Sequence, residues 1–189
     1  MEKQDFIKAY KKQFIAKNKF KIVFEMGALL KGKERVGQVT NRFKEIADFI
    51  FEQKELWVLL ILWDVERGTK NDLAKCGFEE NAATHSYKGK IEDGLLANSR
   101  FDSQAIKESE IKYLKYEKFS FDKISPIVRA IAGYELGFEN SANISAYFLS
   151  FEDTAVLLNL YDDRGMELLN DASEFTSEIS NKFQRYLMK

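Results

Sequence analysis

Three stretches of the chain show the hydrophobic spacing of amphipathic helices. Apolar residues recur every three to four positions over residues 6–14, Arg35–Glu52 and 173–187, with charged residues between them. This period places the apolar side chains on one face of a helix. We therefore predict helices in these stretches. A further helix is expected after Asp122, which caps it, with the sole proline, Pro126, in its first turn.

Other stretches show the patterns of β-strands. Lys21–Met26 alternates between polar and apolar positions, which predicts a strand with one buried face. Leu56–Trp63 is apolar at every position and is too short for a typical helix, so we predict an interior strand that is covered on both faces. Ile111–Phe121 contains four aromatic residues and predicts another strand.

The last third of the chain predicts a hairpin. Two apolar runs, Ile144–Phe151 and Thr154–Tyr161, are separated only by Glu152 and Asp153. A two-residue separation of this kind is typical of a tight β-turn between antiparallel strands.

A second turn follows at once, at Asp162–Gly165, and leads into a third strand at Met166–Leu169. Gly165 is expected to take a positive φ in this turn. The predicted fold class is therefore α+β: a mixed or mainly antiparallel sheet with helices packed against it, ending in a three-stranded meander and a helix. We expect one domain over residues 1–189, with an irregular segment at about 78–110.

Composition and charge narrow the class of protein. The chain has 189 residues with 16 Phe, 8 Tyr and 2 Trp, and its net charge is −1 with a pI near 6.0. This composition excludes a disordered chain, and the charge provides no overall basic field for nucleic acid. The chain has a single cysteine, so it forms no intramolecular disulfide, and its longest apolar run, Leu56–Trp63, is too short for a membrane helix. We therefore expect a cytoplasmic protein.

The acidic turns hold the most distinctive candidate site. Glu152, Asp153, Asp162, Asp163 and Arg164 all lie in or beside the two predicted turns. Adjacent carboxylates beside a guanidinium can bind a partner, hold a divalent metal or serve as an acid–base pair. Asp and Gly are also the ordinary residues of turns, so a purely structural role is the main alternative.

The remaining chemistry-bearing residues form weaker candidates. His85 is the only histidine and follows Glu79 and Glu80, but no second histidine completes a metal motif. Cys76 is expected to be a small buried residue, and would be a nucleophile only if His85 approached it. Gly27 and Gly32 match neither the Walker spacing nor the G-x-G-x-x-G spacing of phosphate-binding loops. A lysine-rich N-terminus is the candidate for a nucleic-acid surface, with Lys3, Lys8, Lys11, Lys12, Lys17, Lys19 and Lys21.

The segment Tyr161–Gly165 resembles a bacterial family of small proteins that is classed only as a domain of unknown function. Members carry a Tyr-Asp-Asp-Arg-Gly turn between two late strands, as this chain does. The likeness extends over most of the chain and includes the stretches Phe24–Gly27, Arg35–Phe51, Leu56–Trp63 and Phe121–Phe138, whereas Glu79–Ser109 matches no part of it. Because genes of this sort often neighbour bacterial toxins, the resemblance implies a protective or immunity role.

We therefore expect a non-catalytic binding protein of the immunity type, whose partner is a cognate toxin and which has no cofactor and no metal. The expected partner-binding residues are the four acids of the turns and Arg164. The charge is segregated, since residues 1–21 carry seven lysines against two acids and residues 151–189 carry eight acids against four basic residues. This segregation and the many aromatic residues suit a protein that acts through a complementary surface. Two alternatives remain open: a metal-assisted hydrolase that uses the acidic turn, and a nucleic-acid-binding module that uses the lysine-rich N-terminus.

Overall fold

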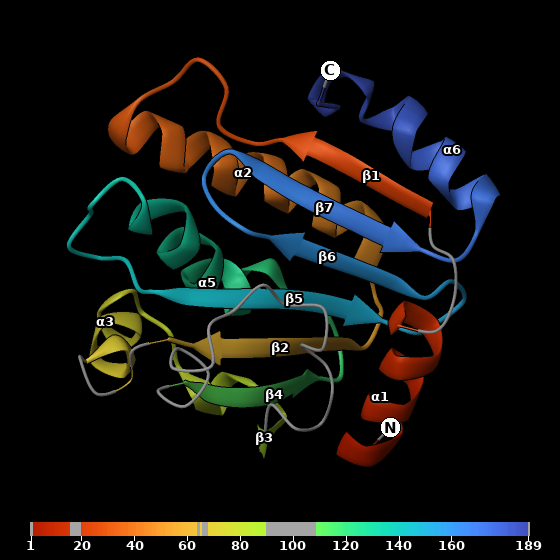
Figure 1. Ribbon diagram of the computed structural model, residues 1–189, viewed down its shortest axis with the longest axis horizontal. Helices are drawn as coiled ribbons and strands as arrows, with labels where there is room; N and C mark the ends of the chain where they lie inside the picture. The colour runs from red at the N-terminus through yellow and green to blue at the C-terminus, as the bar shows by residue number, and fades with distance from the viewer. Residues whose placement is uncertain (1, 16–19, 64, 66–67, 90–108, 189) are drawn as a thin grey trace.

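A single antiparallel sheet forms the centre of the computed structural model, which describes residues 2–15, 20–63, 65, 68–89 and 109–188 (Figure 1). Seven strands of the described residues pair in the order β1-β7-β6-β5-β2-β4-β3, and every neighbouring pair is antiparallel. The strands are β1 (Phe20–Glu25), β2 (Leu56–Leu62), β3 (His85–Gly89), β4 (Glu110–Tyr116), β5 (Ile144–Ser150), β6 (Val156–Leu160) and β7 (Gly165–Asn170).

Helices cover both faces of this sheet. The described α-helices are α1 (Lys3–Tyr10), α2 (Gly32–Phe51), α3 (Thr69–Lys75), α5 (Phe121–Tyr134) and α6 (Ser173–Lys182); a π-helical turn (Lys11–Ile15) continues α1, and 3₁₀ turns lie at Glu80–Ala82 and Gln184–Tyr186. The predicted α+β class is confirmed, as is the C-terminal meander β5-β6-β7 followed by a helix. None of the described helices combines the length and the apolar character needed to cross a membrane.

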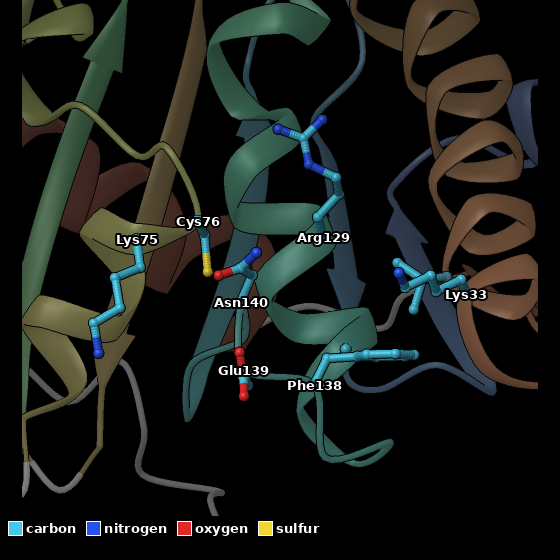
Figure 2. A pocket seen from close by; sticks show the side chains of 9 residues that line it. Lys33, Lys75, Cys76, Arg129, Phe138, Glu139 and Asn140 are labelled. Atoms are coloured by element: carbon cyan, nitrogen blue, oxygen red, sulfur yellow. The ribbon is translucent and has the colours of Figure 1, made fainter.

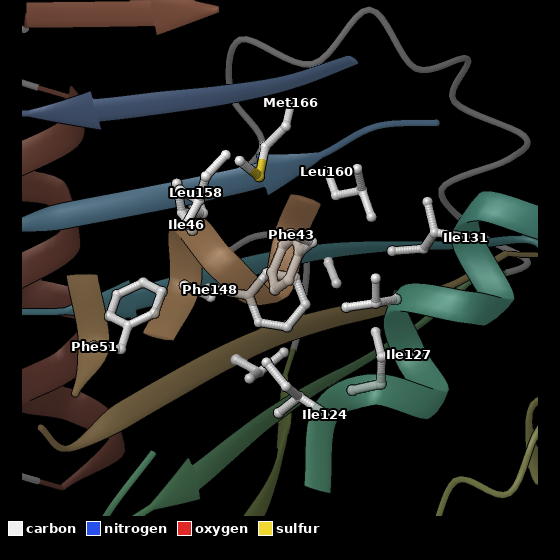
Figure 3. Packing of buried hydrophobic residues seen from close by; sticks show 14 of the residues in the cluster. Phe43, Ile46, Phe51, Ile124, Ile127, Ile131, Phe148, Leu158, Leu160 and Met166 are labelled. Atoms are coloured by element: carbon white, nitrogen blue, oxygen red, sulfur yellow. The ribbon is translucent and has the colours of Figure 1, made fainter. Parts of the chain in front are cut away.

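The larger core lies between the sheet and the pair α2 and α5. Phe43 of α2 packs edge-on against Phe148 of β5, with ring centroids 4.9 Å apart, and Ile127 and Ile131 of α5 join the same buried cluster (Figure 3). The apolar stripe of α2 therefore faces the sheet, as its spacing predicts.

The strand β2 contributes to both cores, which explains why all its residues are apolar. Its alternate residues Val58 and Leu60 belong to the α2–α5 core, whereas Trp57 and Leu59 belong to a smaller core on the α1 face. There, Phe6 of α1 stacks on Trp57 with ring centroids 4.8 Å apart. The prediction of an interior strand covered on both faces is confirmed.

Several local predictions are wrong for identifiable reasons. The β5–β6 connection is a five-residue loop rather than a two-residue turn, because Phe151 leaves the strand to pack on Phe6, and Asp153 takes a φ of 58°. Pro126 is the sixth residue of α5 and lies beyond the first turn. Its missing N–H leaves the Asp122 carbonyl free to accept a hydrogen bond from the Ser125 hydroxyl at 3.2 Å.

The region after β2 also differs from its prediction. The polar stretch after β2 contains the short helix α3, which the sequence does not predict, because Leu73 is its main buried apolar residue and no helical period is visible. The predicted irregular segment at about 78–110 contains strand β3, and residues 90–108 lie outside the described residues.

Candidate functional site

The Asp162 carboxylate organises the turn between β6 and β7. One oxygen accepts hydrogen bonds from the backbone N–H groups of Arg164, at 2.7 Å, and Gly165, at 3.1 Å. The other oxygen accepts from the Arg164 Nε at 2.8 Å. An aspartate that bonds the backbone two and three residues ahead fixes a turn of this kind. Asp162 is therefore buried and fully engaged, while the Arg164 side chain is exposed.

The Asp163 carboxylate connects the same turn to helix α2. It is 4% exposed and forms an ion pair with the Nε of Arg35, which lies in the first turn of α2. Next to it, the Arg164 carbonyl accepts a hydrogen bond from the Met26 N–H at 2.7 Å. The turn is thus bonded to both ends of the β1–α2 loop.

Gly27 makes this contact possible. A Cβ atom at this position would lie 2.1 Å from the backbone oxygen of Asp163, which is closer than any side chain tolerates. The backbone of the β6–β7 turn therefore rests directly on the β1–α2 loop.

The prediction that Gly165 takes a positive φ is wrong. The described glycines with positive φ are Gly32, Gly68, Gly77 and Gly137. Gly165 begins β7, and its lack of a side chain serves packing instead, because a Cβ atom there would lie 2.0 Å from the hydroxyl oxygen of Tyr161.

The predicted partner-binding residues lie at opposite ends of the sheet. Glu152 and Asp153 precede β6, whereas Asp162, Asp163 and Arg164 follow it, so the length of this strand separates the two groups (Figure 1). Glu152 and Asp153 are exposed, and Asp153 has the Lys54 ammonium at 3.7 Å. Together with the burial of Asp162 and Asp163, this arrangement forms no continuous acidic surface.

Several loops that are far apart in the sequence lie together at one end of the strands. They are the β1–α2 loop, the β6–β7 turn, the α5–β5 connection and α3, on the left in Figure 1. The β1–α2 loop is the feature that sequence reasoning missed. Its apolar pair Leu29 and Leu30, between two glycines, was the signal that was available.

Leu29 has an unusual conformation at the tip of this loop. Its side chain is completely exposed and its φ is 67°. The Leu30 N–H donates a hydrogen bond to the Ala28 carbonyl at 2.9 Å, so Leu29 is the central residue of a γ-turn with positive φ, a rare and strained form. Leu30 beside it is partly exposed.

A groove begins at Leu30 and follows the outer side of α2. It has a volume of about 490 Å³, and its lining includes Asn41, Arg42 and Tyr186. The loop and the groove therefore form one continuous surface, which is apolar at Leu30 and mainly polar along α2.

A second hollow lies between α2, α3 and α5. Its volume is about 470 Å³, and Figure 2 shows Cys76, Arg129 and Phe138 among its lining residues. Burial is the main reason that the pKa of the Cys76 thiol is raised, and nearby Asp72 adds to the effect; Arg129 and Lys75 only partly oppose it. The thiol is therefore protonated at neutral pH and is a poor nucleophile.

The remaining candidates are dispersed. His85 is exposed on β3 and stacks on Tyr87, while Glu80 forms an ion pair with Lys112. Among the residues that the structure describes, no three His, Cys, Asp or Glu side chains are grouped closely enough to hold a metal ion.

The lysine-rich N-terminus is partly engaged in the fold. The Lys3 ammonium donates a hydrogen bond to the Lys88 carbonyl at 2.6 Å and lies over the Tyr113 ring. Lys8, Lys11 and Lys12 are exposed, and Lys17 and Lys19 lie outside the described residues.

Comparison with known families identifies the chain. The family described as "Domain of unknown function (DUF3885)" matches residues 7–189. The chain belongs to this family. The DUF3885 match includes both sides of the contact between the β1–α2 loop and the β6–β7 turn. No curated protein and no solved structure matches the chain.

Proposed function

We propose that this DUF3885 protein is a non-catalytic binding protein of the bacterial immunity type, which acts in the cytoplasm and neutralises a toxin by direct contact. The observation that carries the proposal is the fully exposed, strained Leu29 at the tip of the β1–α2 loop. Strained backbone persists only where the surrounding structure holds it, and it is concentrated at functional sites.

The surrounding contacts explain how the loop is held. The Arg35–Asp163 ion pair and the Met26–Arg164 hydrogen bond fix its two ends, and the close packing at Gly27 prevents movement toward the β6–β7 turn. A loop whose backbone is already held in place loses little conformational freedom on binding, so an apolar residue at its tip is a favourable anchor in a protein interface. In this proposal the buried acids support the anchor and do not touch the partner.

The surface around the anchor suits a protein partner. Leu30 and the groove along α2 adjoin the loop, and the exposed Tyr161 ring lies at the end of β6 that leads into the β6–β7 turn. Interfaces commonly combine central apolar anchors with a polar rim. The exposed Arg164 guanidinium is one such rim group.

The alternative of a metal-assisted hydrolase is less well supported by the same geometry. To bind a metal, Asp162 would have to give up its two backbone N–H donors and Arg164, and Asp163 would have to leave Arg35. Removing one partner from a buried ion pair is costly.

The test uses the product of the gene beside this one as the candidate toxin. The toxin is expressed with and without the wild-type protein, and growth and the Kd of the purified pair are measured. We expect protection and copurification. We also expect Leu29→Asp to weaken binding by about 30-fold, which corresponds to about 2 kcal/mol for a hot-spot residue.

Two matched variants complete this test. Phe20→Asp changes another exposed apolar residue at the far end of β1 and is expected to bind like the wild type. The double variant Glu152→Lys and Asp153→Lys alters the exposed acids at the opposite end of β6. Absence of both protection and binding would overturn the immunity role. Strong loss in the acidic double variant, with none in Leu29→Asp, would place the interface at the acidic loop instead.

A further inference from the structure

The outer edge of β1 is covered by the C-terminal end of the chain (Figure 1). Leu187 pairs with Phe24 in an antiparallel bridge, and the Met188 N–H donates a hydrogen bond to the Val23 carbonyl at 3.0 Å. A strand at the edge of a sheet presents N–H and C=O groups that can pair with another chain. Residues 184–188, which we call the strap, therefore occupy part of this edge as a short extra strand would.

The strap lies at the edge of β1, whereas α6 packs on one face of this strand. Ile179 of α6 belongs to the buried cluster on the α2 side of the sheet, as does Phe183, whose ring packs edge-on against Phe24 with centroids 6.4 Å apart. Phe183 is 1% exposed, while residues 184–188 are exposed or partly exposed. Phe183 therefore anchors the chain in the core, and the strap after it covers hydrogen-bonding groups of β1.

One acid of α2 holds the strap in place. The Glu45 carboxylate accepts a hydrogen bond from the Tyr186 hydroxyl at 2.6 Å and forms an ion pair with Arg185. Glu45 and Arg185 are both exposed, and exposed ion pairs contribute little stability because water screens them. A hollow of about 710 Å³ lies beside the strap and is lined by its residues and by Glu25. The strap is therefore held by weak surface contacts and can open while the sheet remains folded.

The sequence of β1 makes its edge complementary to a second copy of itself. Alternate residues of a strand direct their backbone groups to the same edge. The Val23 carbonyl meets the strap at this edge, so the backbone groups of Lys21 and Glu25 face it as well. Two copies of β1 that pair antiparallel about Val23 place Lys21 of each copy opposite Glu25 of the other. Opposite charges directly across such a pair are stabilising, and the contact has the two-fold symmetry of a homodimer.

We propose that the edge of β1, once released from the strap, pairs with β1 of a second copy of this chain. The strap and the second copy both need the Val23 carbonyl, so they exclude each other. The strap thus keeps the protein monomeric until it opens. This inference goes beyond the proposed function, because it involves neither the toxin nor Leu29.

Release of the strap in the full-length chain tests this proposal. Glu45→Ala removes the acid that holds the strap, and Met188→Pro removes the N–H that bonds to Val23. In analytical ultracentrifugation, the double variant is expected to form dimers at concentrations at which the wild type is monomeric. Glu34→Ala, which removes another exposed acid of α2, is the matched control and should stay monomeric.

Charge reversal tests the register of the pairing. In the released double variant, Lys21→Glu is expected to weaken the dimer because it places like charges opposite each other, and the addition of Glu25→Lys should restore it. A released dimer that is insensitive to these changes would overturn the proposal, and so would a wild type that already pairs through β1.

Hydrogen exchange of residues 184–187 shows whether the strap has opened. Faster exchange is expected in the double variant, and in Glu45→Ala alone should the double variant fail to fold. An opened strap in a protein that remains monomeric would contradict the pairing of β1. A strap that exchanges no faster in either variant would show that these contacts do not hold it, which also refutes the proposal.

Discussion

The Asp163 carboxylate pairs with the Arg35 guanidinium and so bonds the β6–β7 turn to the first turn of α2. Both groups are largely removed from water, and the Gly27 backbone lies against the Asp163 carbonyl. A turn whose composition suggests a reactive site thus holds together two parts of the chain that are distant in the sequence.

Removal of the Asp163 carboxylate tests how much this contact contributes to the free energy of unfolding. Asp163→Ala leaves the Arg35 charge without its partner, so the free energy of unfolding is expected to fall by roughly 2–4 kcal/mol. Asp153→Ala, which removes an exposed acid, is expected to change it by less than about 0.5 kcal/mol. Urea unfolding of both variants measures the difference, and equal losses would contradict the role given to Asp163.

The contact at Gly27 is expected to admit no side chain. Gly27→Ala places a methyl group against a backbone oxygen that cannot move aside, and should lower the free energy of unfolding by on the order of 2–4 kcal/mol. Gly37→Ala is the matched control, because a Cβ there meets no atom within 4 Å and α2 gains a better helix former. The control should be stabilised by up to about 1 kcal/mol. Thermal or urea unfolding of the two variants measures both changes, and a Gly27→Ala variant as stable as the wild type would contradict the close contact at Gly27.

Substitution of Leu29 is expected to affect stability and partner binding differently. Leu29→Gly removes the side chain that disfavours a positive φ, so the free energy of unfolding should stay constant or rise by up to about 1 kcal/mol. Toxin protection should nevertheless be lost, because the anchor is absent. A clear loss of stability would show that Leu29 serves the fold.

Acid is expected to weaken the ion-pair network that joins the Glu80–Ala82 turn to β4. Partial burial alone would raise the pKa of Glu80, but hydrogen bonds from Lys112 and Ser86 outweigh it, so the pKa is lowered. Burial opposes ionisation of Glu110 in the same way, and Lys70 and Lys112 lower its pKa. Acids with a depressed folded-state pKa stabilise the fold above their unfolded pKa, and this contribution is lost as the pH falls through the folded pKa.

Urea unfolding between about pH 5 and pH 3 measures this effect. All of these pairs retain some contact with water, so the contribution of each should be below about 1 kcal/mol. Lys112→Met, which removes the partner shared by both acids, should make the free energy of unfolding less dependent on pH in this range. An unchanged pH dependence would exclude the network as a contributor.

The sequence by itself determined the elements with a strong periodic pattern. The continuous apolar run of β2 identified a central strand, and the stripe of α2 identified the helix that covers the sheet, because burial on both faces or on one face imposes these patterns directly. The C-terminal meander was predictable for the same reason, although its first loop was not, since Phe151 turns away to reach Phe6. Helix α3 was missed because Leu73 is nearly its only buried apolar residue.

Only the tertiary structure decided what the acidic turn does. Nothing local distinguishes Asp163 from an exposed turn residue, because its partner Arg35 arrives from another part of the chain. In the same way, the need for glycine at position 165 comes from the Tyr161 ring and not from its own backbone angles. Periodicity reports which side chains meet the core, whereas contacts between distant loops depend on how the strands are ordered in the sheet, and the order β1-β7-β6 brings Gly27 to the turn.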